Sequence, residues 1–401
     1  MTGSRFLHLA WLAWAPLLLI LPLALLLPAC AGPPIVHVAP VAPVAPPEPA
    51  PAEVSPPAQA WPLFDEEPAI RVLIGQSELP VVVAGVGLST PRARELGSVT
   101  IEVVDGVLTS TGDVCEPERC VFHSPGGVAM GAAGPFPGRL EVLASEGELL
   151  TVLEVPIETY LRGVVSAEIP SRWPVEVKMA QAIAARSYAL AHLDQPEAHF
   201  DVRSDTLDQV YRPGENSGAA DAVTRTRGQV LAANGALVEA FYHSTCGGHT
   251  ENPNDVWPDA PALDWATACT TDTESPRHTW EVRLSNSVVA TAHADISHVD
   301  ALRLESRSGS GRALEITVVD GPTSVTMPAP EFRRAIGTRR LGSTFFEART
   351  DGGTVTFTGR GFGHGVGMCQ WGAHGLVAEG NGHREVLAHY YRGTTVMRAY
   401  E

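Results

Sequence analysis

Basic residues are scarce in this chain. Its 401 residues include 28 Lys and Arg against 45 Asp and Glu, so the formal net charge is -17. So acidic a chain is poorly suited to electrostatic binding of nucleic acid or of anionic lipid, and we expect no nucleic-acid partner. Aromatic residues are also few, at 6%, but the hydrophobic total of 44% is enough to build a core. The length allows one large or two moderate domains.

Several sequence patterns are absent as well. No repeat of about 20 to 50 residues occurs outside a proline-rich tract, which excludes a solenoid. No Gly-Lys-Ser/Thr follows the glycine-rich segment at 359–375, which excludes a phosphate-binding P-loop. His199, Asp201, Asp205 and Asp208 lack the spacing of a calcium loop, and we interpret them as a polar loop.

A long apolar run lies at the N-terminus. Arg5 gives it a positive start, and Phe6–Ala29 is almost wholly apolar but is interrupted by Pro16 and Pro22. These interruptions favour a signal peptide over a transmembrane anchor. The run ends in Leu-Pro-Ala-Cys, which resembles a bacterial lipobox. We predict that residues 1–30 are a signal peptide with a lipobox and that Cys30 is lipid-modified, with a plain cleaved signal peptide as the alternative.

Residues 31–62 form a Pro/Ala-rich tract that cannot bury a core and is expected to be an extended linker. A lipid at Cys30 and this tether predict an exported lipoprotein, anchored to a membrane and facing the periplasm or the cell wall. No Asp follows Cys30, so the outer membrane is the expected location if the cell is Gram-negative.

The rest of the chain alternates between two periodicities. Short runs rich in branched residues, bounded by Gly, Pro and Ser-Glu-Gly turns, predict strands over 69–155. Helical spacing follows at 157–168 and in a second segment that starts near SRWPVEV (171–177) and runs to about His192, and Asn-Gly at 234–235 predicts a hairpin. The expected fold class is α+β, a β-rich core with a few helices.

Glu168 has an unusual position in the first predicted helix. It falls on the apolar face, in the last turn, just before Pro170. Burial and the negative end of the helix both raise the pKa of a carboxyl group placed there. Such a group stays protonated near neutral pH and can act as a general acid. The alternative is that the helix ends earlier and Glu168 is solvated.

Five glycines alternate strictly between residues 359 and 367. In an extended segment they would share one face without side chains, where a ligand or another backbone could approach closely. One interpretation is the floor of a groove for a flat polymer, with His364 and Gln370 as hydrogen-bonding groups. The other is a glycine-rich crossing of the core.

Five cysteines follow the lipobox, and export would permit disulfides. Cys115 and Cys120 are close enough to clip a loop, and Cys246 and Cys269 bracket a second polar loop. Cys369 is left over. We predict these two pairings, although sequence cannot determine connectivity.

A zinc site is the competing interpretation of one cysteine. His243, Cys246 and His249 are three residues apart, and with a fourth ligand such as Cys369 or Glu251 they could hold zinc. A disulfide from Cys246 competes with this site. We predict no metal and no cofactor.

Four long segments resemble the SpoIID/LytB family of bacterial cell-wall proteins, in the family's order. They are VPIETYLRGVVSAEIPSRWPVEVKMAQAIAARSYAL, SDTLDQVYRPGENSGAADAVTRTRGQVL, AFYHSTCGGHTEN and GRGFGHGVGMCQWGAHGLVAEGNGHREVLAHYYRGT. The resemblance covers about residues 139–397. It implies a SpoIID-like domain at 139–401, preceded by a β-rich part at 63–138.

The resemblance also implies an activity and its residues. SpoIID is a lytic transglycosylase that cuts peptidoglycan glycan strands already stripped of stem peptides. Glu168 matches the family's catalytic acid, and Arg186 matches a family arginine that we expect to orient Glu168 or the glycan. Candidate substrate-binding residues are Gln181, Tyr242, Ser244, His364 and Gln370. Cys369 departs from the family, in which Ser is common.

One carboxylate suits this reaction, because the sugar's own 6-hydroxyl replaces water as the nucleophile. We therefore expect a peptidoglycan lytic transglycosylase for wall remodelling or septation, with glycan strands as partner. LytB-type relatives are amidase enhancers, so a non-catalytic glycan binder that stimulates a cell-wall amidase is the alternative. A zinc hydrolase at His243, Cys246 and His249 is a third candidate.

Overall fold

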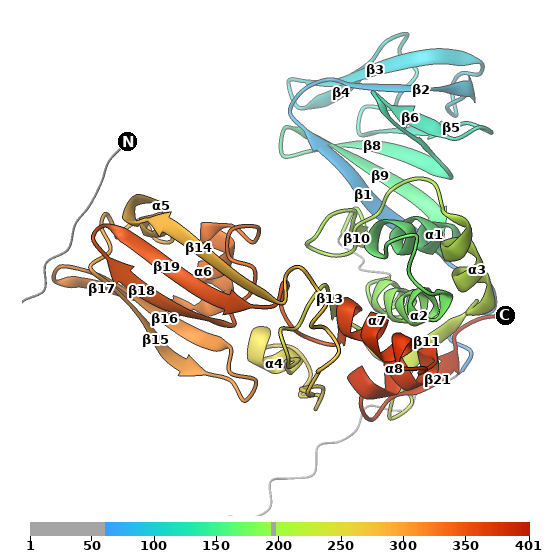
Figure 1. Ribbon diagram of the computed structural model, residues 1–401. Coiled ribbons are helices and arrows are strands. Elements are labelled where there is room, and N and C mark those ends of the chain that lie inside the picture. Colours follow the sequence, from blue (N-terminus) through green and yellow to red (C-terminus); the bar gives the residue numbers. More distant parts are fainter. Residues whose placement is uncertain (1–60, 194–197) are drawn as a thin grey trace, which may run out of the picture. The chain divides into compact units, whose positions relative to one another are not determined.

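The computed structural model describes residues 61–193 and 198–401 (Figure 1). They belong to one compact unit, Pro56–Glu401. The predicted signal peptide, Cys30 and most of the 31–62 linker lie outside the described residues, so these predictions are untested. Among the described residues, no helix is both long and apolar enough to span a bilayer.

The first sheet has five strands in the order β10-β1-β9-β8-β5. Their bounds are β1 Ala69–Ser77, β5 Arg119–His123, β8 Arg139–Ser145, β9 Glu148–Pro156 and β10 Val202–Arg203. β8 and β9 form the hairpin that the Ser-Glu-Gly turn predicted, with Glu146 and Gly147 both at positive φ. β10 pairs with β1 in parallel.

A second five-stranded sheet has the order β4-β3-β2-β6-β7. Its strands are β2 Val81–Leu88, β3 Leu96–Val104, β4 Val107–Ser110, β6 Val128–Met130 and β7 Ala133–Phe136. This agrees with the expected β-rich character of the N-terminal part. The domain boundary expected at residue 139 stays a prediction.

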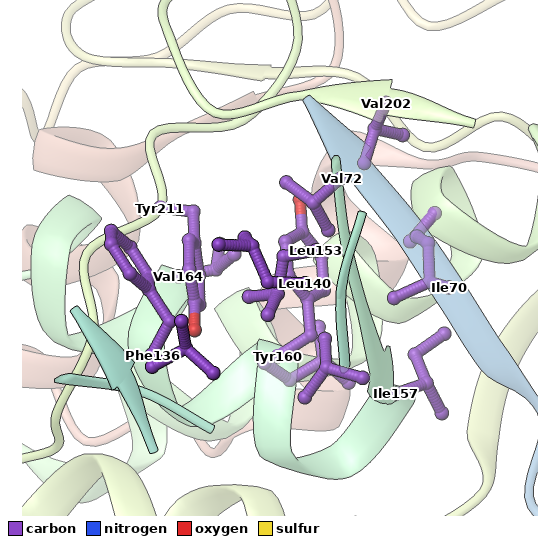
Figure 2. Close-up of a cluster of buried hydrophobic side chains, with 14 of the residues drawn as sticks. Ile70, Val72, Phe136, Leu140, Leu153, Ile157, Tyr160, Val164, Val202 and Tyr211 are labelled. Atoms are coloured by element: carbon purple, nitrogen blue, oxygen red, sulfur yellow. The ribbon is translucent and has the colours of Figure 1, made fainter. Parts of the chain in front are cut away.

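Two helices follow β9, as the periodicity predicted: α1 Ile157–Glu168 and α2 Val175–Ala191. Tyr160 and Val164 of α1 are fully buried and belong to the same hydrophobic cluster as Leu140 of β8 and Leu153 of β9 (Figure 2). α2 is rich in alanine and buried along most of its length, which lets it pack closely against α1. α1 ends at Glu168 because Ile169 precedes Pro170 and is extended.

The C-terminal segment returns to these helices. The Asn234–Gly235 turn joins β11 to β12, confirming the predicted hairpin, and β21 pairs with β11. A second, two-residue parallel pair joins β13 to β20. The elements of this part are α3 Ser217–Arg225, β11 Gln229–Ala233, β12 Ala236–Leu237, β13 Tyr242–His243, α4 Pro253–Val256, β20 Met368–Cys369, α7 Gln370–Ala378, α8 His383–Tyr390 and β21 Thr395–Arg398.

The residues between β13 and β20 include a region with its own hydrophobic cluster, which contains Ile316, Phe332 and Phe357. It holds two three-stranded sheets, ordered β14-β19-β18 and β15-β16-β17. The bounds are β14 Thr279–Ser285, α5 Asn286–Ala290, β15 Ala301–Arg307, β16 Ala313–Asp320, β17 Thr323–Pro328, α6 Ala329–Ile336, β18 Phe346–Asp351 and β19 Thr354–Arg360. The mixture of helices and small sheets confirms the α+β class.

Candidate active site

The carboxyl group of Glu168 is held by two donors from distant parts of the chain. Its Oε1 accepts a hydrogen bond from the backbone N–H of Val210 at 2.9 Å. Its Oε2 accepts one from Nε2 of Gln370, the first residue of α7, at 3.1 Å. The side chain remains partly exposed. Glu168 is therefore oriented by the protein and still open to a ligand.

Burial raises the pKa of Glu168. The hydrogen bonds from Val210 and Gln370 lower it, because they stabilise the charged form, but they do not cancel the effect of burial. A carboxyl group with a raised pKa keeps its proton to higher pH than an ordinary glutamate, which is the requirement for a general acid. The property expected from the sequence is present at this residue.

A glycine in α1 allows the Val210 segment to reach Glu168. A Cβ at Gly163 would lie 2.5 Å from the carbonyl oxygen of Arg212, so only glycine permits this close approach. Tyr211 also stacks on Tyr160 of α1, with ring centroids 5.3 Å apart. The segment is thus pressed onto the helix, and the N–H of Val210 faces the carboxyl group.

Gln181 supports the site from behind. Its Oε1 lies 3.4 Å from Nε2 of Gln370, the same nitrogen that reaches Glu168. Gln181 is fully buried, so its side chain offers no exposed atom to a polymer, and the expected contact with substrate stays a prediction. It acts through Gln370, whose amide it helps to orient.

Tyr242 also belongs to the surroundings of Glu168. Burial raises the pKa of Tyr242 well above its usual value, and the nearby Glu168 carboxylate raises it further. Its hydroxyl oxygen is buried and has no hydrogen-bond partner among the described residues. A second phenol, Tyr160, donates to Gln209 at 3.1 Å. The site thus has two tyrosines, of which sequence reasoning named one.

His364 and Ser244 are connected to the site through the backbone. Nε2 of His364 lies 2.9 Å from the carbonyl oxygen of Tyr242 and so carries the proton, and Nδ1 accepts from the N–H of Val366 at 3.1 Å. Burial lowers the pKa of His364 to about 4, so the ring is neutral. The Ser244 carbonyl accepts from the N–H of Trp371 at 3.1 Å. These contacts hold β13 against the start of α7.

Arg186, which we expected to orient Glu168 or the glycan, makes hydrogen bonds to Glu158 and Gln229 and none to Glu168, and its part in the reaction stays a prediction. Its side chain is completely buried. Nε and Nη2 bond to the two carboxylate oxygens of Glu158 at 3.0 and 2.7 Å. Nη1 bonds to the carbonyl of Gln229 at 3.0 Å. Arg186 therefore ties α2 to α1 and β11, and the charge that it pairs is that of Glu158.

The alternating glycines do not form an extended strip. β19 ends at Arg360, and Gly361, Gly363, Gly365 and Gly367 all have positive φ, which side chains rarely adopt. A Cβ at Gly367 would lie 2.1 Å from the carbonyl oxygen of Phe241. The close approach expected from the sequence is present, but the approaching group is this chain's own backbone. The segment is a crossing of the core, packed against this chain's own backbone.

Of the two predicted disulfides, one is formed and the other is not. Cys115 and Cys120 form a disulfide. Cys246, Cys269 and Cys369 are free and buried, so the predicted pair of Cys246 with Cys269 is not formed.

The proposed zinc trio is not assembled either. Nδ1 of His243 lies 3.0 Å from the carbonyl of Val366, and Nδ1 of His249 lies 2.7 Å from that of Thr250. Neither histidine belongs to the group of possible metal ligands around Cys246.

The site includes groups that sequence reasoning missed. The N–H of Val210 carries no side-chain signal, although the segment SDTLDQVYRPGENS was part of the family resemblance. Trp371 follows Gln370 and is partly exposed, with its ring 4.9 Å from that of Trp173. An exposed tryptophan beside a polar site is a typical stacking surface for a sugar ring.

Comparison with known proteins agrees with the resemblance. Residues 145–232, which hold Glu168 and Val210, match the family described as stage II sporulation protein, SpoIID. Residues 273–367 match a separate domain of unknown function, DUF8618. This second match covers most of the region between β13 and β20.

Three relatives have the same level of identity. An uncharacterized protein of Brachyspira hyodysenteriae is 29% identical over 287 residues, which are 70% of this chain and 77% of the relative. The amidase enhancer of Bacillus subtilis is 29% identical over 289 residues, 59% of this chain but only 40% of the enhancer. Stage II sporulation protein D of Bacillus subtilis is 29% identical over 275 residues, 62% of this chain and 76% of that protein. Residues 145–232 thus match the SpoIID family, and the chain is similar to a stage II sporulation protein D and to an amidase enhancer.

Proposed function

We propose that this chain is a peptidoglycan lytic transglycosylase in which Glu168 is the sole acid and base. The observation that carries the proposal is the state of that carboxyl group, which is partly exposed, raised in pKa by burial and held by Val210 and Gln370. Neither of these donors is a second carboxylate. The names of the relatives, an amidase enhancer and a sporulation protein, support a role in the cell wall.

The proposed reaction uses the two protonation states of Glu168 in turn. The protonated carboxyl gives its proton to the oxygen between MurNAc and GlcNAc as the bond to C1 of MurNAc breaks. The 6-hydroxyl of the same MurNAc then closes on C1, and the Glu168 carboxylate takes the hydroxyl proton. The product is 1,6-anhydro-MurNAc, no water is consumed, and Glu168 ends protonated as it began.

Gln370 and Val210 have a defined part in this cycle. Both are donors, so they stabilise the carboxylate that exists between the two proton transfers. Burial stabilises the neutral acid that starts the cycle. Because burial favours the neutral acid and the two donors favour the carboxylate, Glu168 can both give and take a proton without a large change in its surroundings.

Asp208 is the residue to exclude as a second acid, since it lies on the same segment as Val210. Its Oδ1 accepts from the Tyr188 hydroxyl at 2.6 Å, and its Oδ2 accepts from the N–H of Arg203 at 2.7 Å. Both oxygens already have partners that hold the loop. A hydrolase with two carboxylates is therefore less well supported than a transglycosylase with one.

The test is mass spectrometry of the soluble products after the purified full-length protein is incubated with amidase-treated peptidoglycan. We expect chains ending in 1,6-anhydro-MurNAc, and none with Glu168→Gln. Glu215→Gln is the matched control, because Glu215 is exposed and pairs only with Arg162 among the described residues. Reducing-end MurNAc from the wild type, or anhydro ends from Glu168→Gln, would contradict the proposal.

Similarity to the amidase enhancer supports a second candidate, a non-catalytic glycan binder that stimulates a cell-wall amidase. The same incubation separates the two. Cosedimentation with glycan without soluble product, together with faster digestion by an added amidase, would favour the enhancer. Intact peptidoglycan run in parallel shows whether stem peptides must first be removed. A lipid anchor at Cys30, export and a part in septation remain proposals.

A further inference from the structure

Four buried side chains meet in one place beside the candidate active site. They are Cys246, Cys269, Asp272 and Cys369, which we call the thiol cluster, and their ligand atoms all lie within 4.8 Å of one another. The cluster draws on three separate parts of the chain: the turn after β13, the loop at 269–272, and β20. We propose that the thiol cluster binds one zinc ion. This inference does not depend on the proposed function.

The geometry is close to that of a tetrahedral site. Ligands about 2.3 Å from zinc stand about 3.8 Å apart, and a set of atoms within 4.8 Å needs only small movements to reach this arrangement. Sγ of Cys246 is already 3.2 Å from Oδ2 of Asp272. All four side chains are at most 2% exposed, as is typical of a structural zinc site that has no open position.

The spacing of two members has the form of a metal-binding turn. Cys269 and Asp272 are separated by two residues, the separation found between paired cysteine ligands in zinc turns, with a carboxylate as the second ligand. Thiolate and carboxylate ligands in a closed tetrahedral set favour zinc. The zinc alternative in the sequence included Cys246 and Cys369 but combined them with His243 and His249. Cys269 was assigned to a disulfide, and Asp272 carried no signal.

The backbone supports these groups as metal ligands. The N–H groups of Cys246 and Gly372 point at Sγ of Cys369, at 3.2 and 3.3 Å. The N–H of Gly247 donates to Oδ2 of Asp272 at 2.7 Å. Donors of this kind orient metal ligands and stabilise thiolates. A thiol that pairs with another cysteine does not need them.

A positive group lies beside the cluster. Three thiolates and a carboxylate carry four negative charges, of which zinc neutralises two. Arg312, almost fully buried, donates to the carbonyl of Cys246 at 2.7 Å. Its guanidinium offsets part of the remaining charge at the edge of the site.

The zinc ion would stabilise the part of the chain that carries Gln370 at the candidate active site. Cys369 precedes Gln370, whose amide reaches Glu168. Zinc at the thiol cluster would hold the start of α7 to the turn after β13 and to the 269–272 loop. Its expected role is structural, as a brace that sets the position of Gln370.

The experiment measures metal content, without any substrate, so its result is independent of glycan cleavage. The full-length protein is dialysed against zinc, then against buffer, and zinc is quantified by plasma mass spectrometry. We expect about one zinc ion per chain. Replacement by cobalt should give the near-ultraviolet charge-transfer band of thiolate ligands.

Two variants locate the metal. Cys369→Ser should lose most of its zinc on dialysis against a weak chelator, and its fold should survive because serine is common here in the family. The double variant Cys115→Ser with Cys120→Ser removes the two disulfide-bonded cysteines, which lie outside the thiol cluster. It should keep its zinc.

Three results would overturn the proposal. The first is a folded wild type that binds no zinc or cobalt and has all three thiols free. The second is a disulfide between any two of Cys246, Cys269 and Cys369 in peptide mass mapping. The third is zinc retained equally by Cys369→Ser and by the wild type.

Discussion

Nε2 of Gln370 donates a hydrogen bond to Oε2 of Glu168 at 3.1 Å, across 202 positions of sequence. The two residues lie at the ends of different helices: Glu168 is the last residue of α1, and Gln370 is the first residue of α7. Ile169 and Pro170 end the first helix, and the N-cap residue Cys369 begins the second. Helix ends therefore fix both side chains.

Gln370→Met removes the donor to Glu168 and keeps the length of the side chain. Loss of a hydrogen bond to the charged form raises the pKa of Glu168 further, so the pH above which cleavage slows should move upward. We also expect kcat to fall about 10- to 100-fold, because the carboxyl loses its orientation. Rates of anhydro-product formation across pH measure both effects.

Gln76→Met is the control for that prediction, because Gln76 is an exposed glutamine that also hydrogen-bonds a carboxylate, that of Glu148. It should leave the pH profile unchanged. A Gln370→Met enzyme whose profile matches the wild type would show that Gln370 does not set the ionisation of Glu168.

Glu168→Gln should make the protein more stable at neutral pH. The folded state raises the pKa of Glu168 above its ordinary value of 4.5, so the folded form binds the proton more tightly than the unfolded form. The wild type then loses stability as the pH rises from 4.5 through the folded pKa, and the glutamine variant does not. Urea unfolding of both proteins measures the difference, which should vanish in acid. A variant less stable than the wild type at neutral pH would contradict the inferred cost of burying this charge.

Arg186→Met should destabilise the fold and leave cleavage by folded molecules nearly intact. The substitution leaves the Glu158 carboxylate, which is 5% exposed, without its charged partner. Removing one partner of a buried ion pair lowers the free energy of unfolding by about 3 to 5 kcal/mol. The urea midpoint should fall accordingly. Loss of activity in a variant with wild-type stability would restore Arg186 to the reaction.

The same pair predicts acid sensitivity. Burial raises the pKa of Glu158, but Arg186, the Tyr400 hydroxyl and the N–H of Gly228 outweigh it, and the pKa lies below 4.5. A depressed folded pKa gives stability that is complete above the unfolded value of 4.5 and is lost as the pH falls through the folded one. In Arg186→Met this loss in acid should be smaller, as urea unfolding at neutral and acidic pH would show.

Gly367→Ala should strongly destabilise the fold. The new Cβ would lie 2.1 Å from the Phe241 carbonyl at a φ of +69°, and relief of such a contact in the core costs about 3 kcal/mol or more. Gly353→Ala is the matched control, since Gly353 has a φ of +87° and open space around the Cβ position. It carries only the backbone strain, about 1 kcal/mol. Equal thermal shifts for the two variants would contradict the packing argument.

Local periodicity was enough to predict α1 and the place of Glu168 at its end, because both depend on neighbouring residues. It could not predict the partners of Glu168. One is a backbone N–H of Val210, which every residue but proline would offer, and the other is Gln370, brought near by the pairing of β20 with β13. Long-range pairing of this kind leaves no signal in a short window of sequence.

Where the sequence-based expectations differ from the structure, the cause is again long-range packing. Arg186 and Glu168 both occur in buried helices, and only the packing of α1 on α2 shows that Arg186 pairs with Glu158 instead. The alternating glycines were consistent with an extended strip and equally with the left-handed backbone that they form. The expected bond between Cys246 and Cys269 left out Cys369, which is distant in sequence but adjacent in space, and Asp272, which lies near Cys269.

The parallel pairing of β13 with β20 makes the surroundings of Glu168 depend on a part of the chain that is synthesised late. The residues that complete the surroundings of Glu168 are made about two hundred positions after it, on the far side of a region with its own core. A chain that stalls or is cut before residue 370 keeps the acid and lacks its partner. On the proposed function, such a fragment would cleave glycan more slowly than the whole chain, and the site would be complete only when the last part of the chain had folded into place.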